Sequence, residues 1–193
     1  MLFAADMKPR HSSSLILVWR VAEFEARRLN ASRIEPTHLL LGLCKVVDLD
    51  LPELLSKDSP DRDQVLEELL REVRRVRDVF SQAGFDARRF RRHFRAALGA
   101  GSSAQATAGR LHRTDAAKEV FAAAEGFAAL ANSPVYPVHL LYASLVAEDE
   151  KRDEVLAALG TEKKPLQEAA KAEVIPGRGP ASPQASDGRR HWN

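Results

Sequence analysis

Apolar residues recur at steps of three and four along most of the chain, the spacing that places them on one face of an α-helix. The first segment of this kind covers residues 12–29, with Ser12 as its N-cap. Its apolar positions are Leu15, Val18, Trp19, Ala22, Ala26 and Leu29. A second helix is predicted over residues 36–47, because Pro36 suits a first helical turn. This segment is apolar almost all round, so we expect it to be buried.

Helical spacing continues to residue 98 after an irregular stretch. Residues 49–61 contain two prolines and are predicted to form a loop or a frayed segment. A long helix is predicted from about residue 62 to 83, and Gly84 ends it as a glycine just past the last helical turn. A further helix follows Asp86, and its apolar positions at a spacing of four are Phe90, Phe94 and Leu98.

The second half of the chain has the same organisation, after a small, polar and glycine-bearing linker. Thr114 begins a new helix, residues 139–147 form a second and mostly apolar helix, and two shorter helices are expected over 152–159 and 165–173. We therefore divide the chain into a flexible N-terminus (1–11), a first repeat (12–98) with an insertion at roughly 45–71, the linker (99–113), a second repeat (114–173) and a disordered tail (174–193).

The two halves match in sequence at nearly constant offsets. An offset of 102 pairs Trp19 with Phe121, and an offset of 76 pairs Gly84 with Gly160. Between them, an offset of 101 pairs Pro36, His38, Leu39 and Leu40 with Pro137, His139, Leu140 and Leu141. The fall from 101 to 76 means that the first copy carries 25 extra residues. Each copy alone has too little core to be stable, so we predict an all-α domain in which two four-helix repeats pack about a pseudo-twofold axis.

Composition excludes several classes of protein. The chain has 45% hydrophobic and 29% charged residues, which is ordinary for a soluble globular protein, and a net charge of +2 does not indicate a polyanion partner. No apolar run reaches the roughly 18–20 residues that a membrane helix needs. Cys44 is the only cysteine, which excludes an intrachain disulfide and fits a reducing compartment. We interpret the protein as cytoplasmic, with no membrane contact.

This pattern resembles the Clp amino-terminal domain, the double repeat that precedes the motor in Clp-type protein unfoldases. The resemblance covers about residues 12–170 and rests on Ala26-Arg27-Arg28-Leu29, on the block from Ile34 to Leu43, and on Pro137-Val138-His139-Leu140-Leu141. It implies a helical domain without catalytic activity that recruits adaptors or substrate proteins. The chain looks like the free-standing versions, without a motor, that modulate Clp proteases. No Gly-x-x-x-x-Gly-Lys-Ser/Thr loop occurs, so we expect no ATP binding.

The chain departs from the family pattern beside the two histidines. Family members that bind phosphoarginine place a glutamate directly before the histidine of each copy. Thr37 and Val138 occupy these positions here, and neither offers a carboxylate to a guanidinium group. Glu35 lies on the other side of Pro36, in the first copy only. We keep Glu35, Thr37 and Val138 as candidate partner-binding residues.

Three residues have both a chemical and a structural interpretation. His38 and His139 could be metal ligands brought together by the pseudo-twofold axis, but no neighbouring residues complete a zinc-binding set. We therefore favour structural histidines, each hydrogen-bonded to the loop before its helix. Cys44 could be a nucleophile, although its apolar helix favours a buried small residue. No Gly-x-Ser-x-Gly or His-Glu-x-x-His motif occurs, and we expect no enzyme activity, no metal and no cofactor.

Nine arginines lie between Arg71 and Arg95, against three acidic residues, so this stretch has a charge of +6. We favour a solvated helix face over a core of aromatic residues, with an acidic protein partner or nucleic-acid phosphates as alternatives. The candidate contacts are Arg88, Arg89, Arg91 and Arg92. Residues 49–55 (LDLPELL) could form a docking segment or a lid, although packing of their leucines on the insertion helix is favoured.

These observations favour a Clp-type protein-binding module. Its expected partners are proteins: a Clp unfoldase, a protease subunit, an adaptor or a substrate. The second hypothesis is a basic helical nucleic-acid-binding protein that uses residues 71–95. An enzyme ranks third, because no catalytic constellation can be assembled from the motifs.

Overall fold

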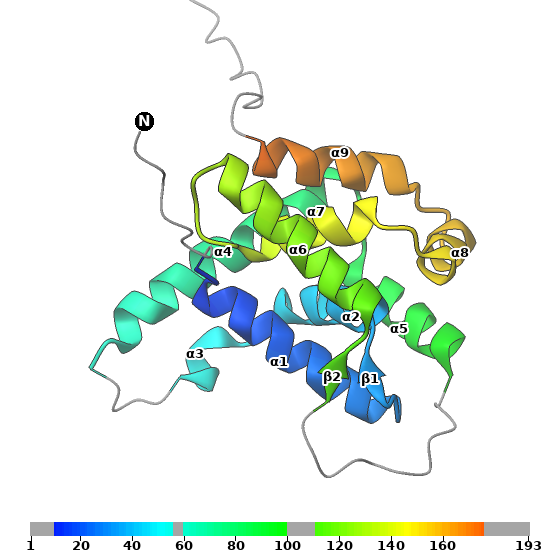
Figure 1. The fold of residues 1–193 in the computed structure, drawn as a ribbon, viewed down its shortest axis with the longest axis horizontal. Coiled ribbons are helices and arrows are strands. Elements are labelled where there is room, and N and C mark those ends of the chain that lie inside the picture. The colour runs from blue at the N-terminus through cyan, green and yellow to red at the C-terminus, as the bar shows by residue number, and fades with distance from the viewer. Residues whose placement is uncertain (1–9, 56–59, 100–110, 176–193) are drawn as a thin grey trace, which may run out of the picture.

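The computed structural model describes residues 10–55, 60–99 and 111–175, and within these ranges it is all-α apart from two very short strands (Figure 1). The first repeat contains α1 (Ser13–Arg28), β1 (Arg33–Ile34), α2 (Pro36–Val46), α3 (Leu51–Leu54), α4 (Arg62–Gln82) and α5 (Ala87–Leu98). The second repeat contains β2 (His112–Arg113), α6 (Asp115–Leu130), α7 (Pro137–Val146), α8 (Glu150–Ala158) and α9 (Lys163–Val174). The predicted fold class is confirmed.

The first helices of the two repeats begin and end in the same way. The Ser12 hydroxyl accepts a hydrogen bond from the Leu15 N–H (3.3 Å), and the Thr114 hydroxyl caps α6 in the same way. After the last turn, Asn30 and Asn132 both adopt a left-handed backbone, with φ of 53° and 47°. Asparagine tolerates this conformation better than most residues, so in both repeats the backbone turns sharply toward the second helix. The offset of 102 therefore relates backbone geometry as well as sequence.

Two short parallel strand pairings link the repeats to each other. β1 pairs in parallel with β2, so the segment that leads into α2 lies beside the segment that leads into α6. His11 forms the corresponding parallel bridge with Val135. The Thr114 N–H donates to the Ile34 carbonyl (2.9 Å), and the Ser12 N–H donates to the Val135 carbonyl (3.1 Å). These reciprocal contacts are what a pseudo-twofold axis between the repeats requires.

The helices pack in the same reciprocal order. Within the repeats, α1 packs on α2 and α6 packs on α7, while across the repeats α4 packs on α9 and α5 packs on α8. In Figure 1, α1 and α6 run in opposite directions across the front of the molecule, and the rings of Trp19 and Phe121 meet between them at 5.8 Å. A single cluster of buried apolar residues extends through both repeats. The two repeats therefore share one core.

Gly42 allows α1 and α2 to cross closely. A Cβ at this position would lie only 2.8 Å from the Val18 carbonyl oxygen and 3.1 Å from the Ala22 nitrogen, both in α1. The equivalent residue of the second repeat is Ala143, at the offset of 101. The α1–α2 pair therefore requires the smallest side chain at its crossing, which explains the glycine in the His-Leu-Leu-Leu-Gly-Leu block.

The insertion of the first repeat consists of α3 and the N-terminal part of α4. The offset of 76 relates α5 to α9 over their full lengths, but it relates only the last turns of α4 to the shorter α8. Residues 49–61 were predicted as loop or frayed chain, and this is wrong for residues 51–54, which form α3 around the buried Leu51. Leu51 anchors this turn on α4, a tertiary contact that local sequence does not reveal.

Other predicted boundaries shift by a few residues. The linker predicted over 99–113 ends before Leu111, which is buried, and before β2. Of the N-terminal segment 1–11, residues 10 and 11 pair with Val135. Asp149 caps α8, which therefore begins two residues earlier than predicted, and α9 does so as well. The segments 1–9, 100–110 and 176–193, predicted as flexible, linker and tail, lie outside the described residues.

Candidate protein-interaction site

The two repeat-signature histidines occupy equivalent corners of the fold. The Glu35 N–H donates to Nδ1 of His38 (3.0 Å), and the Tyr136 N–H donates to Nδ1 of His139 (2.9 Å). Each imidazole therefore accepts the hydrogen bond of the backbone N–H three residues before it, at the start of α2 or α7. Both side chains are buried, at 3% and 2% exposure. These bonds match the structural role favoured from the sequence.

Burial keeps both imidazoles neutral. It lowers the pKa of His38 to about 4, against a small opposing effect of the Glu25 charge, and lowers the pKa of His139 to about 4, with the Arg75 charge acting in the same direction. A neutral ring is required because a protonated Nδ1 could not accept the backbone hydrogen bond. Within the described ranges, no group of three histidine, cysteine or acidic residues is arranged to hold a metal ion.

The residues beside these histidines are mostly inaccessible. Thr37 is 7% exposed and Val138 is 1% exposed, so the structure places both candidate partner-binding side chains in the interior. Glu35 is exposed at the start of α2, where it forms a capping box with His38. Cys44 is buried in α2, and burial raises the pKa of its thiol well above the ordinary value, which disfavours the nucleophilic thiolate. This corner of the fold is therefore structural.

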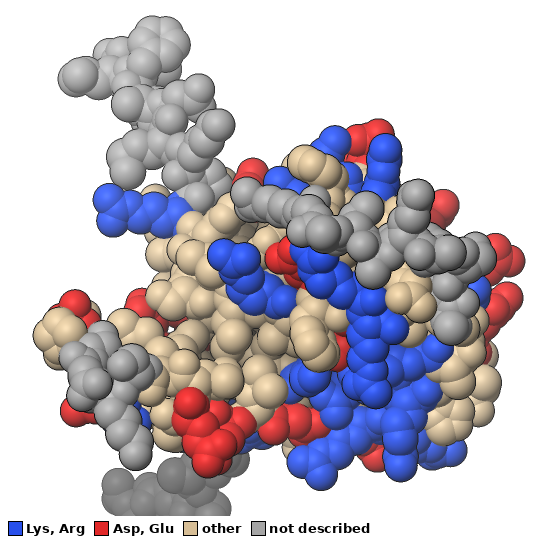
Figure 2. Space-filling view, turned by 90° about the horizontal axis from the view of Figure 1, so that it is seen from below, with Lys and Arg blue, Asp and Glu red and all other residues tan. Residues whose placement is uncertain are grey.

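The arginine-rich region of α4 and α5 has a solvated face and a buried one. Phe90 and Phe94 are fully buried beneath α5. Figure 2 shows that lysine and arginine side chains gather on the right-hand side of the molecule, the side on which α5 lies in Figure 1. Of the four candidate contacts, Arg88, Arg89 and Arg92 are exposed on α5, and Arg91 is partly buried. The amphipathic interpretation of α5 is therefore correct.

Many of these arginines bind other parts of the same chain. Arg88 and Arg91 both contact the carboxylate of Asp48, at 3.0 and 2.9 Å, which ties α5 to the start of the insertion. Arg77 donates to the Val47 carbonyl (2.7 Å). Arg75 donates to the side chain and backbone of Glu173, at 3.0 and 2.8 Å, which ties α4 to α9. Much of the +6 charge predicted for this stretch therefore stabilises the fold and is not available to a partner.

One of these ion pairs reaches the interior. Nε and Nη2 of Arg95 donate to the two carboxylate oxygens of the fully buried Glu25, at 2.8 and 2.5 Å, and Lys45 approaches the same carboxylate at 3.5 Å. Sequence reasoning missed this pair because α1 and α5 are separated by 70 residues. The cation Arg152 is itself fully buried, and it donates to the carbonyls of Ser144 and Ala147 and fixes α8 on α7. In both cases the sequence did offer one signal: a charged residue, Glu25 or Arg152, at a helix position where the apolar spacing leads one to expect a hydrophobic residue.

The leucines of residues 49–55 (LDLPELL) were expected to pack on the insertion helix, and most of them are buried or partly buried. Leu51 is 3% exposed, and Leu49 and Leu55 are partly buried against the core. Leu54 remains 52% exposed. The segment lines a shallow hollow against α4, together with Leu70 and Val73.

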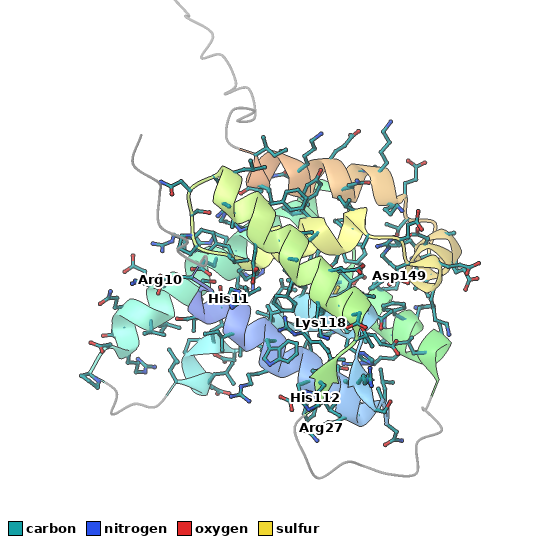
Figure 3. The ribbon with its side chains drawn as sticks, in the orientation of Figure 1. Arg10, His11, Arg27, His112, Lys118 and Asp149 are labelled. Atoms are coloured by element: carbon teal, nitrogen blue, oxygen red, sulfur yellow. The ribbon has the colours of Figure 1, made fainter. Side chains whose placement is uncertain are left out.

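A different hollow lies where the two repeats meet, and none of the predicted site residues forms it. It has a volume of about 420 Å³ and is lined by His11, Leu15, Ile16, Trp19, Arg20, Leu111, His112, Arg113 and Phe121. These residues come from α1, the segment before it, β2 and α6. We call it the axial hollow. Figure 3 labels His11 beside the start of α1 and His112 on β2, toward the opposite end of α1.

Comparisons with known proteins identify the fold. No protein-family model and no curated protein sequence matches the chain. The N-terminal domain of Hsp104 from Candida albicans is structurally similar, with a TM-score of 0.60 and 16% identity, over 83% of this chain and 89% of that domain. The N-terminal domain of the caseinolytic protease associated chaperone ClpD from Arabidopsis thaliana gives a TM-score of 0.57 and 18% identity, over 88% of this chain and 97% of that domain.

A third similar structure comes from a study of a malarial protein secretion system, with a TM-score of 0.57 and 17% identity over 86% of this chain. The chain therefore has the fold of the Clp and Hsp104 N-terminal domains, as the sequence resemblance implied. Among the described helices, none combines the length and the apolar character needed to cross a membrane.

Proposed function

We propose that this chain is a non-catalytic protein-binding module that recruits or modulates adaptors or substrates of a Clp-type unfoldase–protease in the cytoplasm. The observation that carries the proposal is the similarity of nearly the whole described fold to N-terminal domains of Clp-type chaperones, with both copies of the repeat present. Fold similarity alone does not determine function, so the proposal also depends on the site.

The polar groups of the repeat signature support a binding role over a catalytic one. His38 and His139 are each committed to a backbone hydrogen bond, and Cys44 is buried in an apolar helix. An acid–base or nucleophilic catalyst needs a titratable group that substrate can reach. The exposed features are instead helix faces, arginines and the axial hollow, which are suited to protein contacts.

A pull-down from the native host tests this proposal. The full chain is immobilised, and captured proteins are identified by mass spectrometry, with the heat-unfolded chain as the control. We expect a Clp unfoldase, a Clp protease subunit or one of their adaptors to be enriched on the folded chain only. Recovery of no component of a Clp system would contradict the proposal.

Nucleic-acid binding is the alternative that the exposed arginines favour. Arg71, Arg74, Arg89 and Arg92 are exposed on α4 and α5. Phosphate contacts would make the affinity fall steeply with salt concentration. A salt-titrated binding assay with DNA and RNA oligonucleotides decides this alternative: absent or salt-insensitive binding eliminates it.

A further inference from the structure

One side of α1 carries apolar residues that the core covers only in part. Leu17, Val21 and Phe24 recur at steps of four and three, and the exposed Arg28 follows one turn later. Leu17 and Val21 are partly buried, whereas Phe24 is 55% exposed. The short helix α3, which lies below α1 in Figure 1, presents Leu54, which is 52% exposed. We define the α1–α3 face as these five residues together with Asp50 and Glu53 of α3.

The repeat fold does not require apolar residues on this side of the helix. The offset of 102 relates the three apolar positions of α1 to exposed positions of α6, which hold Glu119, Ala123 and Gly126. A Cβ on Gly126 would meet no heavy atom within 4 Å, so a larger side chain would fit there. The helix α3 belongs to the insertion and has no counterpart in the second repeat. The exposure of Phe24 and Leu54 is therefore a property of the first repeat alone, and such patches mark interaction surfaces.

Opposite charges flank the α1–α3 face at its two ends. Within the described ranges, the exposed side chains of Arg28, Asp50 and Glu53 form no ion pair. In Figure 1, α3 lies below the first half of α1, whereas Figure 3 labels Arg27 at the opposite end of that helix. Figure 2, seen from below, shows an area of uncharged residues with acidic side chains at its lower edge and lysines and arginines to its right. The face is therefore acidic toward one end and basic toward the other.

We propose that the α1–α3 face binds a second copy of this chain in a twofold-symmetric dimer, in which the α1 helices of the two copies lie antiparallel. A twofold axis brings the same patch of both copies together with its direction reversed, so the acidic end of each copy meets the basic end of the other. Glu53 of each copy then lies beside Arg28 of the other, and Phe24 and Leu54 lie between the two ion pairs. This dimer goes beyond the proposed function and depends on no Clp component.

Sedimentation equilibrium of the purified full chain tests the dimer directly. We expect the mass to rise from the chain mass of 21.3 kDa toward twice this value as the concentration increases through the micromolar range. Phe24→Ser should weaken the dimer by about tenfold or more, because buried aromatic side chains dominate the energy of most interfaces. Leu130→Ser is the control: Leu130 is 81% exposed at the α6 position equivalent to Arg28, and its loss should leave the dimer unchanged.

Charge reversals test the proposed pairing of Glu53 with Arg28. Glu53→Lys sets two cations opposite each other and Arg28→Glu sets two carboxylates opposite each other, so each variant alone should dimerise about tenfold more weakly or worse. An equimolar mixture of the two variants has one reversed pair and one native pair, so it should form a heterodimer about as tight as the wild-type dimer. Arg89→Glu, at an exposed arginine of α5, matches the charge change of Arg28→Glu and should have no effect. Circular dichroism confirms that each variant is folded.

Several results would overturn the proposal. They are a chain that stays monomeric throughout the micromolar range, a dimer that Phe24→Ser and both charge reversals leave intact, and folded charge-reversal variants that fail to associate when mixed. A monomeric chain whose Clp capture in the pull-down is lost in Phe24→Ser would show that a Clp component covers this face in place of a second copy. A dimer with these properties that captures no Clp component refutes only the proposed function.

Discussion

At the residue scale, His38 and His139 explain why the repeat signature contains a histidine. Each accepts a backbone N–H through Nδ1 in the interior, at 3.0 and 2.9 Å, and burial lowers both pKa values to about 4. In the unfolded chain the pKa of each imidazole returns to the ordinary histidine value of 6.5. Below that pH the unfolded chain therefore binds up to two protons that the native chain does not bind.

We accordingly expect stability to fall as the pH is lowered from about 6.5 to about 4, with no further loss from these histidines below that range. Urea unfolding at a series of pH values measures this dependence. The double variant His38→Asn/His139→Asn keeps a hydrogen-bond acceptor at each position but cannot take up the protons. If wild type and the double variant show the same slope between pH 6.5 and 4, this explanation of the histidines is wrong.

The arginine ion pairs give a second prediction at this scale, because they differ in burial. Glu25 is fully buried, whereas the Asp48 side chain is 22% exposed and its partner Arg88 is 72% exposed. Removing one charge of a buried pair leaves the other uncompensated, so we expect Glu25→Gln to lower the free energy of unfolding by about 3–5 kcal/mol. We expect Asp48→Asn to cost about 1 kcal/mol or less. Chemical denaturation measures both, and a larger cost for Asp48→Asn would contradict the assignment.

At the scale of elements, the closeness of two helices depends on one missing side chain. A Cβ on Gly42 would lie 2.8 Å from the Val18 carbonyl, in a rigid helix backbone that cannot move aside easily. We expect Gly42→Ala to lower the free energy of unfolding by about 1–3 kcal/mol, although alanine is the better helix former by about 1 kcal/mol. Gly126→Ala is the control, because no heavy atom lies within 4 Å of a Cβ there. Thermal unfolding should show opposite shifts for the two variants; a stabilised Gly42→Ala protein would refute the close crossing.

Helices and their ends were predicted correctly where the local sequence signals agree. Elements whose formation depends on tertiary contacts were missed. The caps Ser12, Thr114 and Asp86 and the turn glycine Gly84 stand at helix ends as predicted, because capping is a local interaction. The short helix α3 and the strands β1 and β2 depend on contacts between distant segments, so no local pattern revealed them. The axial hollow was missed for the same reason: His11, Trp19 and Arg113 lie together only once both repeats are packed.

At the scale of the whole molecule, the repeats form one cooperative unit. The pairings β1–β2 and His11–Val135 cross between the repeats, and so do the helix contacts α4–α9 and α5–α8. A repeat separated from its partner would expose the apolar faces that these contacts bury. The sequence offsets predicted this duplication, and reciprocal hydrogen bonds at 2.9 and 3.1 Å show how it is held together.

Unfolding of the two halves, followed by circular dichroism, tests the mutual dependence of the repeats most directly. Residues 10–99 and residues 111–175 are produced as separate polypeptides and studied alone and as an equimolar mixture, beside the full chain. We predict that neither half alone shows a cooperative unfolding transition and that the mixture regains one. A half that unfolds cooperatively in isolation, near the midpoint of the full chain, would show that the repeats are independent domains and would contradict the shared core and the axial hollow built upon it.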